Sequence, residues 1–184
     1  AAADEHGVLP MFYLELTTGI RRGELVALLW DDLDLETQTL SISKSAGRIN
    51  GEVKVTQPKT ANSVRTIYLP QETIDLLIQE HAKHPGNPIM FPSPVTGNLY
   101  GPDCIGRLHK NLLKKAGITE NIPFHGLRHT FATLAIQQGI DAKTVSSILG
   151  HYSAGFTLDT YTHMTNEMQR EAAQRMGSFM AQTV

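Results

Sequence analysis

Three clusters of polar residues in this chain could do chemistry on an anionic substrate. The first, TGIRRGE at residues 18–24, places Arg21 and Arg22 at the expected start of a helix. Positive charge opposes the helix dipole there, so the arrangement is unfavourable unless an anion lies nearby. Two adjacent arginines are more often solvated surface residues, and this cluster alone leaves both interpretations open.

The second cluster is PFHGLRHT at residues 123–130. His125 and Arg128 are three residues apart and therefore share one face of a helix. An arginine can bind a phosphate through two parallel hydrogen bonds, and a histidine can add a donor or carry a proton. The alternative is a histidine bonded to a carbonyl and an arginine paired with an acid, and a His-x-x-Arg motif alone does not decide between them.

The third cluster is LGH at residues 149–151, followed by TYTH at residues 160–163. The hydroxyl pKa of an ordinary tyrosine is about 10, so Tyr161 can act as a nucleophile only with cations beside it. Most tyrosines in such a helix are core or rim residues. A zinc site at His151 and His163 is not expected, because Cys104 is remote and no His-Glu-x-x-His motif or carboxylate pair is present.

In this order, with Lys59 of a PKT motif between the first two, the clusters closely resemble the tyrosine recombinases, also called phage-type integrases. The resemblance covers residues 10–165 and is carried by TGIRRGEL, PKT, HGLRHTFAT, LGH and TYTH. Within that family, RRGELVALLWDDLD and LGHYSAGFTLDTYTHM look like the integrases of conjugative transposons from Gram-positive bacteria. The expected fold is α+β and mainly helical, with a small three-stranded antiparallel sheet on one edge.

The resemblance implies a site-specific DNA recombinase that integrates or excises a mobile element. Tyr161 would attack a DNA phosphodiester, giving a 3′-phosphotyrosyl enzyme and a free 5′-hydroxyl. The transition state carries extra charge on its non-bridging oxygens, which Arg21 and Arg128 can clamp and to which His125 and His151 can donate. The phosphotyrosyl ester resembles the phosphodiester that it replaces, so neither a metal nor another cofactor is expected.

The leaving 5′-oxygen must be protonated, a role that the family assigns to a lysine, here Lys59. Lys44 and Lys54, in the same predicted hairpin region, are the runners-up. Glu24, three residues after Arg21, is a supporting candidate that would orient an arginine or a histidine. Its simpler interpretation is an ordinary ion pair along a helix.

The charge of the chain is uneven although its net value is only −2. Residues 41–130 carry eleven bases and six acids, whereas residues 1–40 carry two arginines and eight acids. A basic middle region fits a polyanion site, although a solvated lysine surface explains it equally well. The expected partners are double-stranded DNA and further copies of the chain, as a dimer to tetramer on DNA, and the candidate DNA contacts are Arg48, Arg107, Lys110, Lys114 and Lys115.

Hydrophobic periodicity predicts the elements that must position these residues. Helices are expected at residues 9–18, 22–30, 70–83, 103–116, 125–138, 141–149, 157–163 and 167–180, with glycine caps at 19, 117, 139 and 150. The acids at 31, 32 and 34 predict a turn. Residues 40–42 are expected to pair with 53–55 in a hairpin around Gly47 and Asn50-Gly51, and a third strand covers 64–69.

The length of 184 residues predicts one domain with a tail. Residues 1–165 would form the catalytic domain, the family's N-terminal core-binding domain would be absent, and residues 166–184 would form a helix with one apolar stripe. That helix is expected to dock in trans on a neighbouring protomer in the DNA-bound assembly, and in cis or loosely in the free protein. The longest apolar run, at 25–30, is too short to cross a membrane, and one cysteine fits the cytoplasm better than a disulfide scaffold.

Three other functions compete with recombination. Residues 141–161 have the pattern of a helix-turn-helix, so the chain could be a non-enzymatic DNA-binding module. A type IB topoisomerase or a telomere resolvase would share the chemistry, and a helical interaction domain would use only the tail. A covalent DNA adduct that is lost in Tyr161→Phe would separate the enzymes from the binding modules.

Overall fold

The computed structural model describes residues 1–57 and 63–150, together with residues 170, 173, 174, 176, 178 and 181 of the C-terminal stretch. The expected helices at 157–163 and 167–180 therefore lie outside the described residues, apart from these last positions. Each of those positions is helical and exposed, and Met176 of the expected apolar stripe is 61% exposed.

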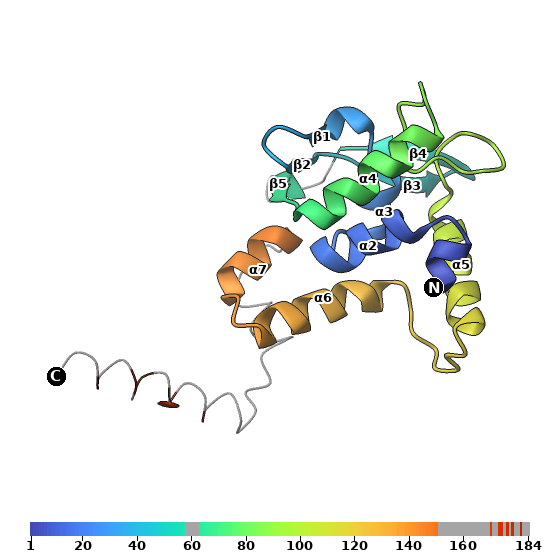
Figure 1. The fold of residues 1–184 in the computed structure, drawn as a ribbon. Coiled ribbons are helices and arrows are strands. Elements are labelled where there is room, and N and C mark those ends of the chain that lie inside the picture. The colour runs from blue at the N-terminus through green and yellow to red at the C-terminus, as the bar shows by residue number, and fades with distance from the viewer. Residues whose placement is uncertain are drawn as a thin grey trace.

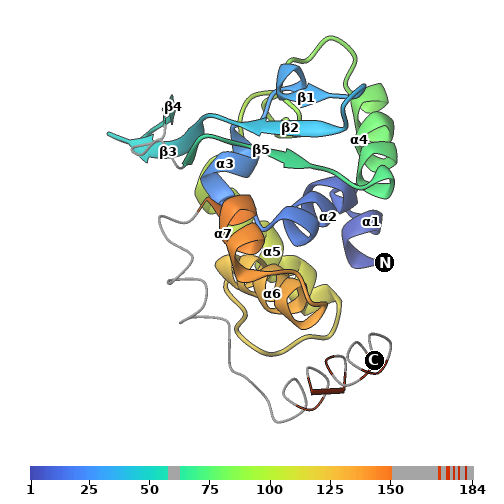
Figure 2. The same ribbon diagram turned by 90° about the vertical axis from the view of Figure 1, so that its left-hand side faces the viewer.

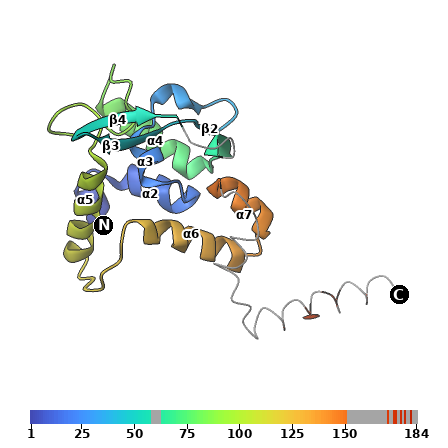
Figure 3. The same cartoon turned by 180° about the vertical axis from the view of Figure 1, so that it is seen from behind.

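The described elements are arranged in layers, which Figure 1 shows from top to bottom. The strands lie at the top, α4 (Gln71–Lys83) and α2 (Leu9–Thr18) follow, and α6 (His125–Gln137) lies below them. α5 (Pro102–Lys115) and α7 (Ala142–Leu149) stand on opposite sides of α2, as Figure 3 also shows from behind. This arrangement confirms the mainly helical α+β fold.

The central helix α2 ends where the sequence predicts. Met11, Phe12 and Leu14 are buried in the main core, and Gly19 caps the helix with a left-handed φ of 60°. A side chain at Gly19 would also come within 2.6 Å of Phe131 on α6. Glycine is therefore required twice here, once for the backbone conformation and once for the close packing of α2 on α6.

A three-stranded antiparallel sheet is present as predicted, but it is not formed by the predicted three strands. β2 (Thr39–Ile42) lies between β1 (Leu33–Asp34) and β5 (Arg65–Tyr68) in one antiparallel sheet. β3 (Ser45–Ile49) pairs only with β4 (Glu52–Thr56) among the described strands, and Figure 2 shows this hairpin projecting beyond the larger sheet. The expected pairing of residues 40–42 with 53–55 is wrong.

The turn of that hairpin explains the error. Asn50 and Gly51 have φ values of 51° and 85°, so they form a two-residue turn inside the predicted hairpin loop. Such a turn makes residue 49 the partner of residue 52, and the pairing then reaches back only to Ser45 opposite Thr56. Residues 40–42 are left to pair with β5, where Leu40 lies opposite Ile67 in the core.

The predicted helix at 22–30 is also too long. α3 (Arg22–Val26) is followed by an extended segment, then by the 3₁₀ turn η1 (Trp30–Asp32), and the expected acidic turn becomes partly the strand β1. Leu28 accepts a hydrogen bond from Met90 and Leu29 bridges to Ile89, so this segment pairs with the chain at 88–90. A uniformly apolar run has no periodicity that would distinguish a continued helix from an extended segment.

The remaining described helices agree with the sequence prediction to within one or two residues. A single-turn helix, α1 (Ala2–Glu5), was not predicted. Asp141 caps α7 by accepting hydrogen bonds from the amides of Lys143 and Thr144, at 3.0 and 2.9 Å. A second, smaller core, composed of Ala132, Ala135, Ile136, Val145 and Leu149, fixes α7 to α6.

Across the described ranges, we find no helix of the length and apolar character needed to cross a bilayer.

Candidate active site

Three arginines that are far apart in the sequence meet at the C-terminal end of α7. Each donates a hydrogen bond to one of three successive carbonyl groups: Arg65 Nε to Ile148 at 2.5 Å, Arg128 Nη2 to Leu149 at 2.7 Å and Arg21 Nη2 to Gly150 at 2.9 Å. The last carbonyls of a helix have no partner within it and carry the negative end of its dipole, so guanidinium groups suit this position. The LGH motif is therefore the point at which the two arginine motifs converge.

Arg128 joins two helix ends. Its side chain is 1% exposed, and Nη1 donates to the carbonyl of Gly19 at 2.6 Å while Nη2 donates to that of Leu149. These carbonyls belong to the C-terminal ends of α2 and α7. Arg21 and Arg128 are the two of these arginines that come from the sequence motifs, and both donate to carbonyls at the end of α7. We refer to them together as the arginine clamp.

Glu24 connects Arg21 to β5. Its carboxylate accepts from the backbone amide of Arg21 at 2.9 Å and from Nη1 at 2.8 Å, and it receives two hydrogen bonds from Arg65, at 2.8 and 3.2 Å. Burial raises the pKa of Glu24, but the hydrogen bonds and charge of Arg65, together with the hydrogen bonds of Arg21, outweigh burial and lower the pKa below its ordinary value. Glu24 is therefore a carboxylate that fixes the orientation of Arg21.

Arg65 is the residue of this cluster that the sequence analysis missed. Its guanidinium donates hydrogen bonds to the carboxylate of Glu24 and to the carbonyls of Ile148 and Ser63. The alternation of side chains along β5 could have indicated its role. Arg65 lies two residues before the buried Ile67 and therefore on the same face of the strand. An arginine on the core side of a strand needs a buried partner.

His125 begins α6 and is exposed. Its imidazole lies against that of His129, with ring centroids 4.8 Å apart. Partial burial, and then the charges of His129, Arg128 and Arg21, lower the pKa of His125 below its ordinary value of 6.5. The imidazole is therefore mainly neutral at pH 7, with one nitrogen able to donate and the other able to accept a proton.

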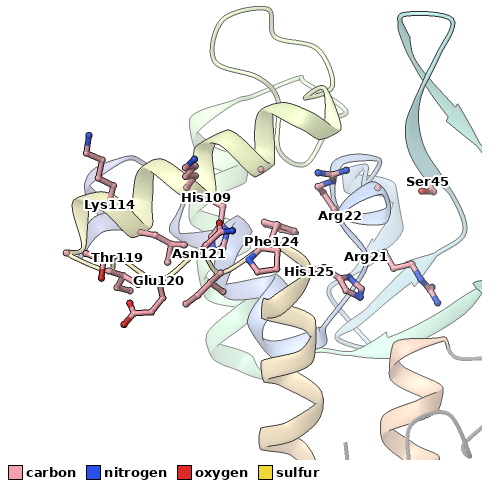
Figure 4. Close-up of a pocket in the computed structure, with 18 residues that line it drawn as sticks. Arg21, Arg22, Ser45, His109, Lys114, Thr119, Glu120, Asn121, Phe124 and His125 are labelled. Atoms are coloured by element: carbon pink, nitrogen blue, oxygen red, sulfur yellow. The ribbon is translucent and has the colours of Figure 1, made fainter. Parts of the chain in front are cut away.

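A groove of about 1080 Å³ opens beside the clamp, between α3, α5 and the segment that leads into α6. Figure 4 shows Arg21, Arg22 and His125 at one end of it, with His109 and Lys114 further along. Lys110 also lines the groove. Arg22, which the sequence analysis left outside the catalytic set, therefore belongs to the same cationic surface.

Only two of the candidate DNA contacts share this groove, Lys110 and Lys114. The other three are held elsewhere: Arg48 by Asp103 at 3.4 Å, Arg107 by the thiol of Cys104 at 3.2 Å and Lys115 by Glu5 at 2.6 Å. The structure thus separates the five candidates into a pair that lines the groove and three side chains with partners of their own.

A model of the phage integrase family matches residues 6–168, which is most of the chain. The chain belongs to the phage integrase family. It is 29% identical over 194 residues to a XerC-like tyrosine recombinase of Caldanaerobacter subterraneus, covering 93% of this chain and 49% of that protein. It is also 31% identical over 174 residues to the ICEBs1 integrase of Bacillus subtilis, covering 89% and 46%. The chain spans about half the length of these curated relatives.

Solved structures confirm the fold. The Tn1549 transposon integrase in complex with transposon right-end DNA superposes with a TM-score of 0.81 at 24% identity, covering 94% of this chain and 59% of that one. The XerA recombinase superposes with a TM-score of 0.73 at 27% identity, covering 95% and 60%. The expected family and fold class are therefore both confirmed.

Three predicted site residues of this phage integrase chain, Lys59, His151 and Tyr161, lie outside the described residues. Both runner-up lysines are described, and each is paired with an acid: Lys44 with Asp32 at 2.6 Å and Lys54 with Glu52 at 3.3 Å. The described part of the chain shows no group of three or more His, Cys, Asp or Glu residues that could hold a metal ion.

Proposed function

We propose that this chain carries the catalytic site of a tyrosine recombinase, which cleaves and rejoins DNA strands at specific sites. The observation that supports this best is the meeting of Arg21 and Arg128 on successive carbonyls at the end of α7. His151 follows that end directly in the sequence, and Tyr161 is ten residues further on. The family to which the chain belongs favours the same conclusion.

In the proposed mechanism the oxygen of Tyr161 attacks the phosphorus, and the bond between phosphorus and the 5′-oxygen breaks. The phenol proton passes to a base, for which the neutral imidazole of His125 is suitable. Lys59 gives a proton to the leaving 5′-oxygen. Arg21 and Arg128 stabilise the additional charge on the phosphoryl oxygens.

A 5′-hydroxyl of the partner strand then attacks the phosphotyrosine and releases Tyr161. One phosphoester bond forms and one breaks in each step, so the sequence of steps needs neither ATP nor a metal ion. The proposal can be tested by incubating the protein with nicked duplex DNA in EDTA and following strand exchange on a denaturing gel. We expect exchange to continue in EDTA; if chelation abolishes it and Mg²⁺ restores it, the tyrosine mechanism is wrong.

The proposed substrate is double-stranded DNA at recombination sites of a mobile element. A phage integrase is among the relatives and a transposon integrase is among the similar solved structures, which favours a mobile element. The cationic surface of Arg21, Arg22, Lys110 and Lys114 fits a phosphate backbone. The single cysteine, Cys104, fits action in the reducing cytoplasm.

We further propose that two to four protomers assemble on DNA, with residues 1–165 as the catalytic unit. The tail at 166–184 would dock on a neighbouring protomer. The 61% exposure of Met176 is consistent with a tail whose apolar stripe is available to another copy.

Replacing Lys59 by alanine is expected to slow cleavage of ordinary DNA by on the order of 10²-fold, because the leaving oxygen loses its proton donor. A substrate whose 5′-bridging oxygen is sulfur should be cleaved at nearly the wild-type rate, since a thiolate leaves without protonation. Cleavage of both substrates by Lys59→Ala is compared with that by Lys44→Ala and Lys54→Ala. If the sulfur substrate rescues Lys44→Ala or Lys54→Ala and does not rescue Lys59→Ala, the rescued position is the proton donor to the leaving oxygen.

A further inference from the structure

A closed network of hydrogen bonds connects β5, α3 and the end of α7. Arg65 donates from Nη1 and Nη2 to the two carboxylate oxygens of Glu24, at 3.2 and 2.8 Å, and from Nε to the carbonyl of Ile148 at 2.5 Å. Glu24 also accepts from Arg21, and Arg21 donates in turn to the carbonyl of Gly150. We call this circuit of side chains and helix-end carbonyls the Arg65 network.

Arg65 is too buried to contact DNA itself. Its side chain is 6% exposed and that of Glu24 is 4% exposed, and the guanidinium meets the carboxylate through two parallel hydrogen bonds. The side chain of Arg21 is 38% exposed, and among the side chains of the network it is the one that lines the groove. An effect of Arg65 on a phosphate in the groove must therefore pass through a neighbour, and Arg21 is that neighbour.

Arg65 and Arg21 span the same gap, from Glu24 to the end of α7. Gly150 has a left-handed φ of 65°, and a Cβ at this position would come within 3.0 Å of Arg65 Nη1 and 3.1 Å of its Cδ. β5 packs on α7, and Figure 1 shows the strand above the helix. The bonds of Arg65 to Glu24 and Ile148 therefore fix the separation that Arg21 has to bridge.

Arg21 is held at both ends of that gap before any substrate is present. Glu24 accepts from its Nη1 at 2.8 Å, and the carbonyl of Gly150 accepts from its Nη2 at 2.9 Å. Donors that are fixed in advance need no reorganisation when charge develops in the transition state. A displacement of about 1 Å in such a group can cost on the order of 10²-fold in rate.

We propose that Arg65 is a positioning residue of the cleavage reaction, which holds Arg21 in the orientation that meets the scissile phosphate. It does so by fixing Glu24 and the end of α7 relative to each other, and its own side chain touches no reacting atom. This inference rests on the proposed function, because it places the scissile phosphate in the groove beside the clamp.

The first test is single-turnover cleavage of a nicked suicide DNA by Arg65→Lys. A lysine keeps the charge, but one ammonium group cannot bond both oxygens of Glu24 and the carbonyl of Ile148 together. We expect the rate at saturating DNA to fall by about 10²-fold, with affinity within about twofold of the wild type. Ile67→Val is the matched control, because it shortens a buried side chain of the same strand and leaves the network intact. It should unfold at a lower temperature and cleave as the wild type does.

A methylphosphonate substrate separates positioning of the clamp from general damage to the fold. A methyl group in place of one non-bridging oxygen removes the negative charge of the scissile phosphate, so a clamp arginine has less charge to stabilise. The ratio of the wild-type rate to the Arg65→Lys rate should fall from about 10² on ordinary DNA to below about 5 on this substrate. Sulfur at the 5′-bridging position should leave the ratio unchanged, because it relieves only the need to protonate the leaving oxygen.

A double-variant cycle tests the link to Arg21 directly. If Arg65 acts through Arg21, the two losses are not additive, and Arg65→Lys should cost less than about threefold in the Arg21→Lys background. Independent losses that multiply would show that Arg65 acts on the reaction by another route, and would contradict the assignment.

A second variant keeps the test decisive if Arg65→Lys does not fold. Glu24→Gln/Arg65→Gln removes both charges of the buried pair, so it leaves no unpaired charge in the interior. It also removes the charged link between β5 and α3, so we expect the same loss on ordinary DNA and the same response to methylphosphonate.

Three results would overturn this inference: a folded variant that cleaves within about threefold of the wild type, a loss of equal size on phosphate and methylphosphonate, or rescue by the sulfur substrate instead. The proposed function fails separately, since a wild-type protein that forms no covalent adduct with DNA is not a tyrosine recombinase. A wild-type adduct together with any of the three results would remove only the role of Arg65.

Discussion

Substitution of Tyr161 by phenylalanine is expected to abolish DNA cleavage while leaving DNA binding within about twofold of the wild type. The variant loses only the oxygen that forms the covalent bond to phosphorus in the proposed mechanism. We expect the single-turnover cleavage rate on a nicked suicide substrate to fall by at least about 10³-fold. The rate is measured on denaturing gels and the affinity by fluorescence anisotropy.

Tyr68→Phe provides the matched control, because Tyr68 lies on β5 and is 79% exposed. It should cleave as the wild type does. Residual cleavage by Tyr161→Phe above one tenth of the wild-type rate would show that another group is the nucleophile. A comparable loss in both variants would point to a general effect on the protein and would leave Tyr161 without a special role.

Arg128→Lys is expected to lower the cleavage rate by 10²- to 10³-fold, on the order of the loss of one oxyanion donor or more. The guanidinium reaches the ends of α2 and α7 at once, through Gly19 and Leu149, and its planar fork also suits a phosphate. A lysine retains the charge but cannot span both helix ends. The loss should appear in the rate constant at saturating DNA rather than in affinity.

The exposed Arg107 supplies the control for this exchange, since Arg107→Lys makes the same chemical change on the surface of α5. Circular dichroism and thermal unfolding of Arg128→Lys must show a folded protein before its rate is interpreted. A folded Arg128→Lys variant that cleaves within threefold of the wild type would remove Arg128 from the clamp. Arg21→Lys, at a more exposed position, should lose activity in the same direction.

Elements with one clear period and a terminal glycine could be predicted from the sequence. The helix at residues 9–18 ends at Gly19, and α7 begins after the cap Asp141 and ends at Gly150, as expected. Residues 45–49 could not be recognised as a strand, because SAGRI has only one β-branched residue, Ile49, and no aromatic residue. The end of α3 at Val26 depends on pairing with the distant residues 88–90, which no local pattern encodes.

The order of the motifs predicted which residues form the candidate site, but not how they are held. The convergence of Arg21 and Arg128 on the end of α7 depends on the packing of α6 and α7 across a shared core. Arg65 was detectable in principle, from its place on the buried face of β5.

The central claim, that Tyr161 becomes covalently joined to DNA, is tested most directly by mapping the adduct. The protein is incubated with suicide DNA in EDTA, denatured and digested with trypsin and nuclease, and the modified peptide is sequenced by mass spectrometry. Trypsin releases residues 144–170 as one peptide that contains both Tyr152 and Tyr161, so fragmentation must separate the two. We expect a nucleotide 3′-phosphate on Tyr161. A modified Tyr152, a modified residue outside this peptide, or cleaved DNA without any covalent adduct would contradict it.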